Sequence, residues 1–234
     1  MKQRIVSIIL LTLILIPGVT RAQNAPEADT SRLSVALALQ TAQGVENYLS
    51  APDAYGTPLI IKLARQGDVK TLLSLAEYSK DGQFLLSTDK YGNNLFHAAK
   101  NADTVQAAAS LIRRFYGAKA PRKISELVDA RNTLDETPLH AQINAAHTDT
   151  FRPIYAYTSL KKKNDSAHNQ LARLRGSDER IYAQHKAIYC QHIIEAGSAH
   201  GITLWQAAQT QTQYNPSMSQ IAYSIGRVLP CLVN

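Results

Sequence analysis

The chain has 234 residues, of which 45% are hydrophobic and 18% are charged, and its formal net charge is +7. This length suffices for one domain with a substantial core or for two small ones, which excludes a miniprotein held together mainly by disulfides. Aromatic residues make up only 7% of the chain while alanine and leucine are abundant, so the composition favours helices over an all-β sandwich. Two cysteines are too few for a four-thiolate zinc site.

Residues 1–22 have the pattern of a secretory signal peptide. Lys2 and Arg4 precede an apolar run at residues 5–16, which Pro17 and Gly18 end. The run is shorter than the roughly 20 apolar residues that span a bilayer, and small residues precede an expected cleavage site after Ala22. The alternative is an uncleaved membrane anchor. Cleavage predicts a periplasmic protein of a bacterium, in an oxidising compartment and without a membrane span.

Beyond an expected flexible N-terminus at residues 23–30, a short pattern recurs along the chain. With Thr57, Asn94, Thr137 and Thr203 taken as equivalent, the spacings are 37, 43 and 66 residues. A threonine can cap a helix, and a following proline fits the first turn, where its missing N–H costs nothing. The similar strings lie at residues 53–59, 89–99, 135–141 and 201–208.

These strings resemble the ankyrin repeat pattern D-x-x-G-x-T-P-L-H-x-A-A. The resemblance implies an all-α solenoid over residues 31–232, built from about four to five helix-pair units with a degenerate leading unit. The pattern fails between about 148 and 200, where we expect an enlarged helical fourth unit. The residues expected to have structural roles in the repeats are Thr57, Pro58, His97, Thr137, Pro138 and His140.

The resemblance also implies a non-catalytic module that binds another protein with its concave face and turn tips. Tyr55 and Tyr91 precede repeat helices and are candidate contact residues, because tyrosine is a frequent interface anchor. A basic stretch is a second candidate, since it would attract an acidic partner; the alternative is a solvated helix face. Its candidate residues are Lys161, Lys162, Lys163, Arg173 and Arg175.

Catalytic and metal-binding patterns are weak. His185 and His192 are seven residues apart and would need a further ligand such as His200, so a metal-dependent enzyme remains only an alternative. We expect no catalytic residues, no metal and no cofactor. Cys190 and Cys231 are candidates for a disulfide that could stabilise the fold by roughly 3 to 4 kcal/mol; the alternative is a pair of buried thiols.

The combined prediction is an exported protein, monomeric alone, that binds and inhibits a periplasmic enzyme. A peptidoglycan hydrolase is the suggested target, which would make the chain an immunity or self-protection protein. The alternative is an ankyrin scaffold or stress-protection partner that supports such an enzyme without inhibiting it. Nucleic acid is not expected as a partner, because no aromatic residues interleave the basic stretch.

Overall fold

The computed structural model describes residues 42–77, 79–174, 179–196, 198–199 and 202–228. The described residues are mostly helical, and the all-α prediction is confirmed. Strands β1 (Ser198–Ala199) and β2 (Ile202–Thr203) form one short antiparallel pair. No described helix combines the length and the apolar character that crossing a bilayer requires. The helices are α3 (Ala42–Ser50), α4 (Leu59–Gln66), α5 (Val69–Ala76), η1 (Gln83–Leu86), α6 (Leu95–Ala98), α7 (Ala102–Tyr116), η2 (Gly117–Lys119), α8 (Ala120–Val128), α9 (Pro138–Asn144), α10 (Phe151–Tyr155), α11 (Ser159–Leu174), α12 (Glu179–Ala196), α13 (Leu204–Thr212) and α14 (Met218–Val228).

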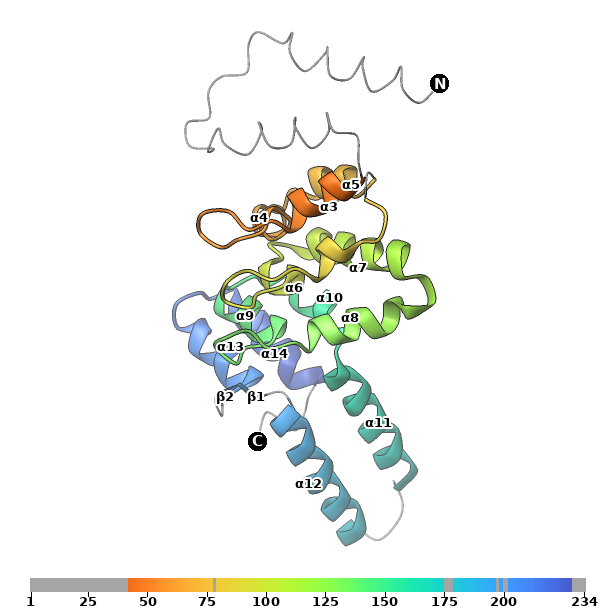
Figure 1. The fold of residues 1–234 in the computed structure, drawn as a ribbon. Helices are drawn as coiled ribbons and strands as arrows, with labels where there is room; N and C mark the ends of the chain where they lie inside the picture. The colour runs from red at the N-terminus through yellow and green to blue at the C-terminus, as the bar shows by residue number, and fades with distance from the viewer. Residues whose placement is uncertain (1–41, 78, 175–178, 197, 200–201, 229–234) are drawn as a thin grey trace.

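Most helices form two layers that run along the molecule. Helices α4, α6, α9 and α13 contact one another in this order, and α5, α7 and α10 lie beside them in the second layer. Helix α14 packs on α13, and the leading helix α3 packs on α4 at the opposite end. We call these helices, together with α8 and the loops between them, the stack (Figure 1). Each helix pair in the stack contacts mainly its neighbours.

The core of the stack follows from apolar residues at helical spacing. Ile60 and Ile61 of α4, and Phe96 of α6, are fully buried. In the second layer, α7 buries alanines at positions 107–109, and their small side chains let neighbouring helices approach closely. Asn101 begins α7 by accepting a hydrogen bond from the N–H of Thr104 at 2.9 Å. Local capping and burial therefore favour the same helix.

A buried carboxylate attaches α3 to the next unit. Glu46 is only 6% exposed, and its Oε1 accepts hydrogen bonds from the N–H groups of Asp81 at 3.3 Å and Gly82 at 3.2 Å. The Ser79 hydroxyl donates to the same oxygen. A buried carboxylate needs such donors to offset its lost hydration. Glu46 thereby fixes the loop before η1 against α3.

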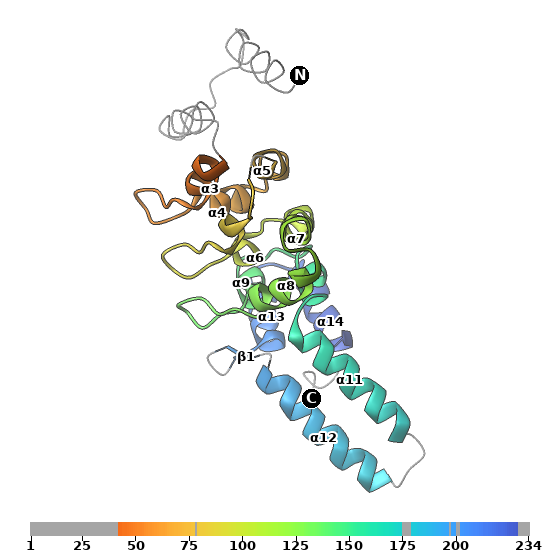
Figure 2. The same ribbon diagram turned by 45° about the vertical axis from the view of Figure 1, so that its right-hand side comes forward.

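Helices α11 and α12 form a hairpin that projects from the stack, and we call it the arm (Figure 2). The sequence predicted the helical insertion at about 148–200. In the structure, residues 151–155 form α10, which packs on α9 and α7 as part of the stack. The arm therefore begins at Ser159, later than the predicted start of the insertion. The buried side chains of α11, which are Leu160, Asn164 and Ala167, lie in its first half. The arm is thus packed mainly where it leaves the stack.

Several predictions concern residues outside the described part of the chain. These are the signal peptide and its cleavage site, the flexible N-terminus and the start of the leading unit, as well as Arg175, His200 and Cys231. Cys190 lies within α12 and is disulfide-bonded. Cys231 is the only other cysteine of the chain.

Candidate partner-binding surface

Three loops of the stack contain the same tight turn, which begins at Asp53, Asp89 and Asn132. In each turn, the first residue's side-chain Oδ1 accepts hydrogen bonds from the backbone N–H groups two and four residues later, all at 2.9 Å. The fourth residue has a left-handed backbone, with φ of 77° at Gly56, 76° at Gly92 and 56° at Asp135. Asx side chains favour such turns because they bond to their own backbone.

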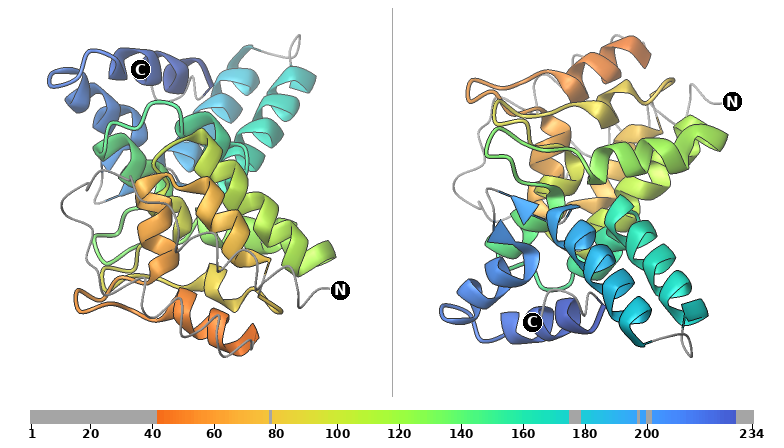
Figure 3. Two further views of the ribbon diagram at one scale, coloured as in Figure 1. Left: turned by 90° about the horizontal axis from the view of Figure 1, so that it is seen from above. Right: turned by 90° about the horizontal axis from the view of Figure 1, so that it is seen from below.

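The three turns also contact one another. The N–H of Lys90 donates to the carbonyl of Gly56 at 3.0 Å, and the N–H of Thr133 donates to the carbonyl of Tyr91 at 2.8 Å. A Cβ at Gly56 would lie 3.0 Å from the Cβ of Lys90, so the close approach adds a second reason for glycine there. The turns therefore stack at one edge of the molecule in a fixed register (Figures 2 and 3).

Each turn exposes a large apolar side chain at its third residue. The exposed fractions are 75% for Tyr55, 53% for Tyr91 and 60% for Leu134. We call these three residues the tip row. The Lys90 ammonium lies 4.9 Å from the centre of the Tyr91 ring, a cation–π contact that orders the second tip. The tip row thus presents apolar side chains on turns that the backbone already holds in place.

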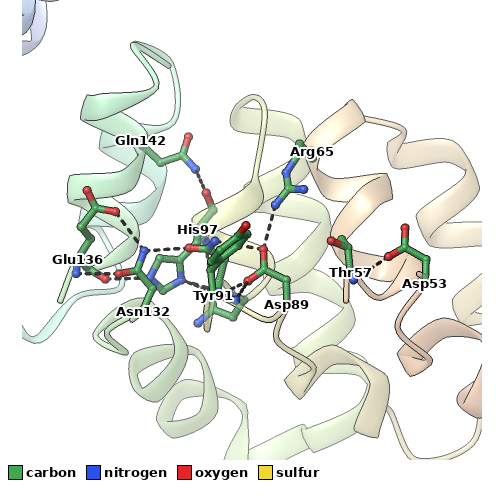
Figure 4. Close-up of polar contacts among 11 residues, drawn as sticks. Asp53, Thr57, Arg65, Asp89, Tyr91, His97, Asn132, Glu136 and Gln142 are labelled. Atoms are coloured by element: carbon green, nitrogen blue, oxygen red, sulfur yellow. Dashed lines mark hydrogen bonds and ion pairs between the residues drawn. The ribbon is translucent and has the colours of Figure 1, made fainter. Parts of the chain in front are cut away.

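Ion pairs with side chains of α4 hold the first two turns in place. Asp53 pairs with Lys62 of α4 at 2.7 Å. Asp89 pairs with Arg65 of α4 at 3.1 Å (Figure 4). The hydrogen bond from Lys62, assisted by the N–H of Thr57, lowers the pKa of Asp53 to about 2. The third turn has the neutral Asn132 instead, whose Nδ2 donates to Asn93 at 2.9 Å and to Glu136 at 3.1 Å. An aspartate could not donate these bonds.

His97 joins the second turn to the third. Its Nε2 lies 3.0 Å from the carbonyl oxygen of Glu136, and because a carbonyl only accepts, Nε2 must carry the proton. Its Nδ1 then accepts from the N–H of Asn94 at 3.3 Å. Burial lowers the pKa of His97 and outweighs the opposing charges of Glu136 and Asp89. The imidazole therefore stays neutral and has a structural place between units (Figure 4).

Gln142 makes a similar link through the short helix α6. This fully buried side chain donates to the carbonyls of Phe96 at 3.0 Å and His97 at 2.7 Å, where α6 ends too early to satisfy them. Its Oε1 accepts from the Thr150 hydroxyl at 3.2 Å and lies 2.8 Å from Nδ1 of His147. The sequence pattern does not single out Gln142, since glutamine is usually a surface residue.

The residues at which the helices begin show that the alignment of Thr57 with Asn94 and Thr137 is wrong by one residue. Pro58, not Thr57, occupies the position before α4 that Asn94 and Thr137 occupy before α6 and α9. Thr57 lies one residue earlier, in the turn, where its N–H donates to Asp53. The Thr137 hydroxyl contacts Nδ1 of His140 at 2.9 Å and makes no cap to the backbone. Pro138 begins α9, and His140 is buried.

The candidate contact residues fall into two separate places. Tyr55 and Tyr91 lie together in the tip row, while Lys161, Lys162, Lys163 and Arg173 lie on α11 of the arm, which leaves the stack elsewhere (Figure 2). Lys161 is ion-paired with Asp165, and the ammonium of Lys162 lies 3.5 Å from the Ser125 hydroxyl. The structure thus divides the predicted contact surface into two.

Sequence reasoning missed Leu134 as the third member of the tip row. Its turn begins with Asn132 rather than aspartate, and Asp135 takes the place of the glycine. Its distance from the following helix start would have identified Leu134. Leu134 precedes Thr137 by the same number of residues as Tyr91 precedes Asn94. The turn is therefore better recognised by spacing than by residue type.

Within the part of the chain that the structure describes, no group of three or more histidine, cysteine, aspartate or glutamate side chains is placed to hold a metal ion. His185 is exposed on α12, and the side chain of His192 and the whole of His200 are outside this part. No protein-family model matches the chain, and no curated protein matches it significantly.

Proposed function

We propose that this chain is an exported ankyrin-repeat protein that binds another protein through the tip row and has no catalytic role. One observation carries the proposal: three large apolar side chains are exposed at the same position of three stacked turns. Core packing gives no reason for these residues, since all three are more than half exposed. Large apolar side chains at a defined surface site are typical of interface anchors.

The rigidity of the turns supports the same proposal. Hydrogen bonds within each turn and between neighbouring turns fix the backbone of Tyr55, Tyr91 and Leu134 before any partner arrives. Binding loses affinity when loops must be ordered, so a surface that is already ordered avoids this cost. The repeated helix pairs and turns support the ankyrin assignment, as does the sequence pattern.

The partner that we propose is an enzyme of the bacterial cell envelope, and a peptidoglycan hydrolase is the first to test. The signal-like pattern of residues 1–22 supports export, and so does the disulfide at Cys190, because disulfides persist in oxidising compartments. A protein that covers the active site of a wall-cutting enzyme would protect its producer. The proposed action is therefore inhibition by occlusion.

The experiment compares variants of the mature chain, which begins at Gln23, in capture from an envelope extract. The test variant replaces Tyr55, Tyr91 and Leu134 with serine. The control variant replaces Tyr214, which follows α13, and Tyr223 of α14 with serine; these side chains are 80% and 69% exposed and lie outside the three turns. Captured proteins are identified by mass spectrometry at about 0.15 M salt, where weak surface attraction is screened.

We expect the unmodified chain and the control to capture one enzyme and to reduce its activity in a stoichiometric assay, and the tip-row variant to do neither. Capture with undiminished activity would contradict inhibition and favour a scaffold. Equal capture by the tip-row variant would contradict the tip row as the contact surface. A folded chain that captures no enzyme would overturn the proposal as a whole.

A further inference from the structure

A hollow of about 160 Å³ lies between α13 and α9 with the third turn, which precedes α9. Glu136, His140 and Asn144 line it from the third unit, and Ile202, Ala207 and Thr210 line it from β2 and α13. Helices α9 and α13 are neighbours in the first layer of the stack (Figure 1). Glu136 follows Leu134 by two residues, so the hollow and the tip row have the third turn in common.

The hollow has a negative charge, and among the residues that the structure describes no lysine or arginine lines it. Glu136 contributes the carboxylate. Its Oε1 accepts from Nδ2 of Asn144 at 2.6 Å, and its Oε2 accepts from Nδ2 of Asn132 at 3.1 Å. Both donors are neutral amides, which orient the carboxylate and leave its charge in place. Arg131, which is close in sequence, pairs with Asp135 instead.

The backbone bonds that all three turns share do not involve this carboxylate. Thr57 and Asn93 occupy the same position in the first and second turns, and each contributes its N–H to the turn, as Glu136 does. The inter-unit bond to His97 also uses only the backbone carbonyl of Glu136. The side-chain charge is therefore present at the third turn alone, and it lines the hollow.

The walls of the hollow suit an aliphatic stem. Ile202 is 51% exposed at its edge, and Ala207 adds a methyl group. Lysine and arginine combine an apolar stem with a cationic end, and each carboxylate oxygen of Glu136 has a lone pair left to accept a further bond. A charge-assisted hydrogen bond in a partly enclosed site is stronger than one on an open surface.

We propose that this hollow binds a lysine or arginine side chain of the partner protein that docks on the tip row. The proposal rests on the proposed function, since it assumes a protein partner, and it specifies that partner's chemistry. The partner surface would carry apolar groups opposite Tyr55, Tyr91 and Leu134, followed by one basic residue that pairs with Glu136. The tip row supplies apolar contact and Glu136 supplies charge selectivity.

The first test needs no partner. The mature chain is titrated with Nα-acetyl-arginine amide, and binding is followed by the NMR shifts of the Ile202 and Ala207 methyl groups. Nα-acetyl-citrulline amide, which has nearly the same shape without the charge, is the ligand control. We expect saturable shifts with the arginine compound, with a Kd in the millimolar range, and none with citrulline.

Two charge variants locate the effect. Glu136→Gln keeps the size and an acceptor oxygen, and we expect it to weaken arginine binding by about tenfold or more. Glu126→Gln removes an exposed carboxylate on α8 that pairs with Arg122 and Lys123, and we expect it to change nothing. Matching amide spectra show that both variants are folded. Equal shifts with citrulline, no saturable shift with arginine, or unchanged binding by Glu136→Gln would each overturn the proposal.

A captured partner gives the second test. We expect Glu136→Gln to weaken its binding by about tenfold and to reduce the salt dependence of association, with Glu126→Gln unchanged. Saturable arginine binding without any captured partner would contradict the protein-binding function but retain the basic-ligand site. A partner held by the tip row with no loss in Glu136→Gln would contradict this inference and leave the proposed function standing.

Discussion

The stack and the arm are both helical, yet they are held in different ways. In the stack, the buried polar side chains of Gln142, His97 and Glu46 make hydrogen bonds between neighbouring units. In the arm, all residues from 183 to 188 of α12 are exposed. The carboxylate of Asp129 accepts from the N–H of Ser159 where the arm begins. The comparison indicates that stability resides in contacts between units of the stack.

The largest effect should come from Gln142→Ala. The change removes the donors to two buried carbonyl groups and leaves a cavity, so we expect the free energy of unfolding to fall by about 3 to 4 kcal/mol. Gln170→Ala on the arm, where the glutamine is exposed, should change it by about 0.5 kcal/mol or less. Urea denaturation measures both, and similar losses in the two variants would contradict the comparison.

Close packing between units predicts the next largest effect, from Gly82→Ala. Gly82 has a φ of 69°, and an added Cβ would lie 2.7 Å from the Cβ of Phe115 on α7. Phe115 would have to move from its edge contact with Phe84, so we expect a loss of about 3 kcal/mol. Gly67 has a similar φ of 76°, but a Cβ added there would lie 3.2 Å from Nδ2 of Asn101 and 3.3 Å from Cδ of Lys100, which are flexible side chains. We therefore expect Gly67→Ala to lower the free energy of unfolding by about 1 kcal/mol. Equal losses, measured by thermal unfolding, would show that the fit between units is loose.

The neutral His97 predicts a pH dependence that arises in the stack. Because burial lowers its pKa below the ordinary value of 6.5, the unfolded chain binds a proton that the folded chain does not. The free energy of unfolding should therefore be unaffected by His97 above pH 6.5 and should fall as the pH decreases below it, by at most about 1.4 kcal/mol per pH unit. His97→Gln, which can still donate to Glu136, should show a flatter profile in denaturation between pH 7.5 and 5. A profile identical to that of the unmodified chain would contradict the neutral imidazole.

The smallest effect should come from Ile188→Ala on the arm. Ile188 is 45% exposed, so little apolar contact is lost and we expect a change of about 0.5 kcal/mol or less. Thermal unfolding at several protein concentrations measures it. A loss above about 1 kcal/mol that grows with concentration would show that the arm packs against a second copy, which would contradict the prediction of a monomer.

Much of the fold follows from local signals in the sequence. The helix pairs were predictable because glycines at left-handed positions, capping residues and apolar spacing coincide, as they do around Gly67 and Asn94. The tips at Tyr55 and Tyr91 were predictable for the same reason, since they have a fixed place in the turn. The alignment of Thr57 was wrong by one residue because the Thr-Pro pair imitates a helix start that lies one residue later.

Other features depend on tertiary contacts that no local pattern contains. Gln142 and Glu46 are buried because they satisfy backbone groups of another unit, far from them in sequence. The hollow at Glu136 needs Ile202, which the chain brings to α9 only after the whole arm has been inserted. The arm itself has helix signals in its sequence, but its exposure depends on tertiary packing, because α10 pairs with α9 and leaves α11 and α12 outside the stack.

The order of contacts along the stack has a consequence for folding kinetics. Helices α4, α6 and α9 pack on one another in chain order, so the contacts among them join segments about one unit apart, whereas the contact between α9 and α13 spans the arm. Chains with such short-range topology need little loop closure before contacts form, and they reach the native state faster than chains that must pair distant strands. Folding can then begin at any interface between two units and spread in both directions. A chain that crosses a membrane unfolded would gain from this, because its first units could fold while later ones are still emerging.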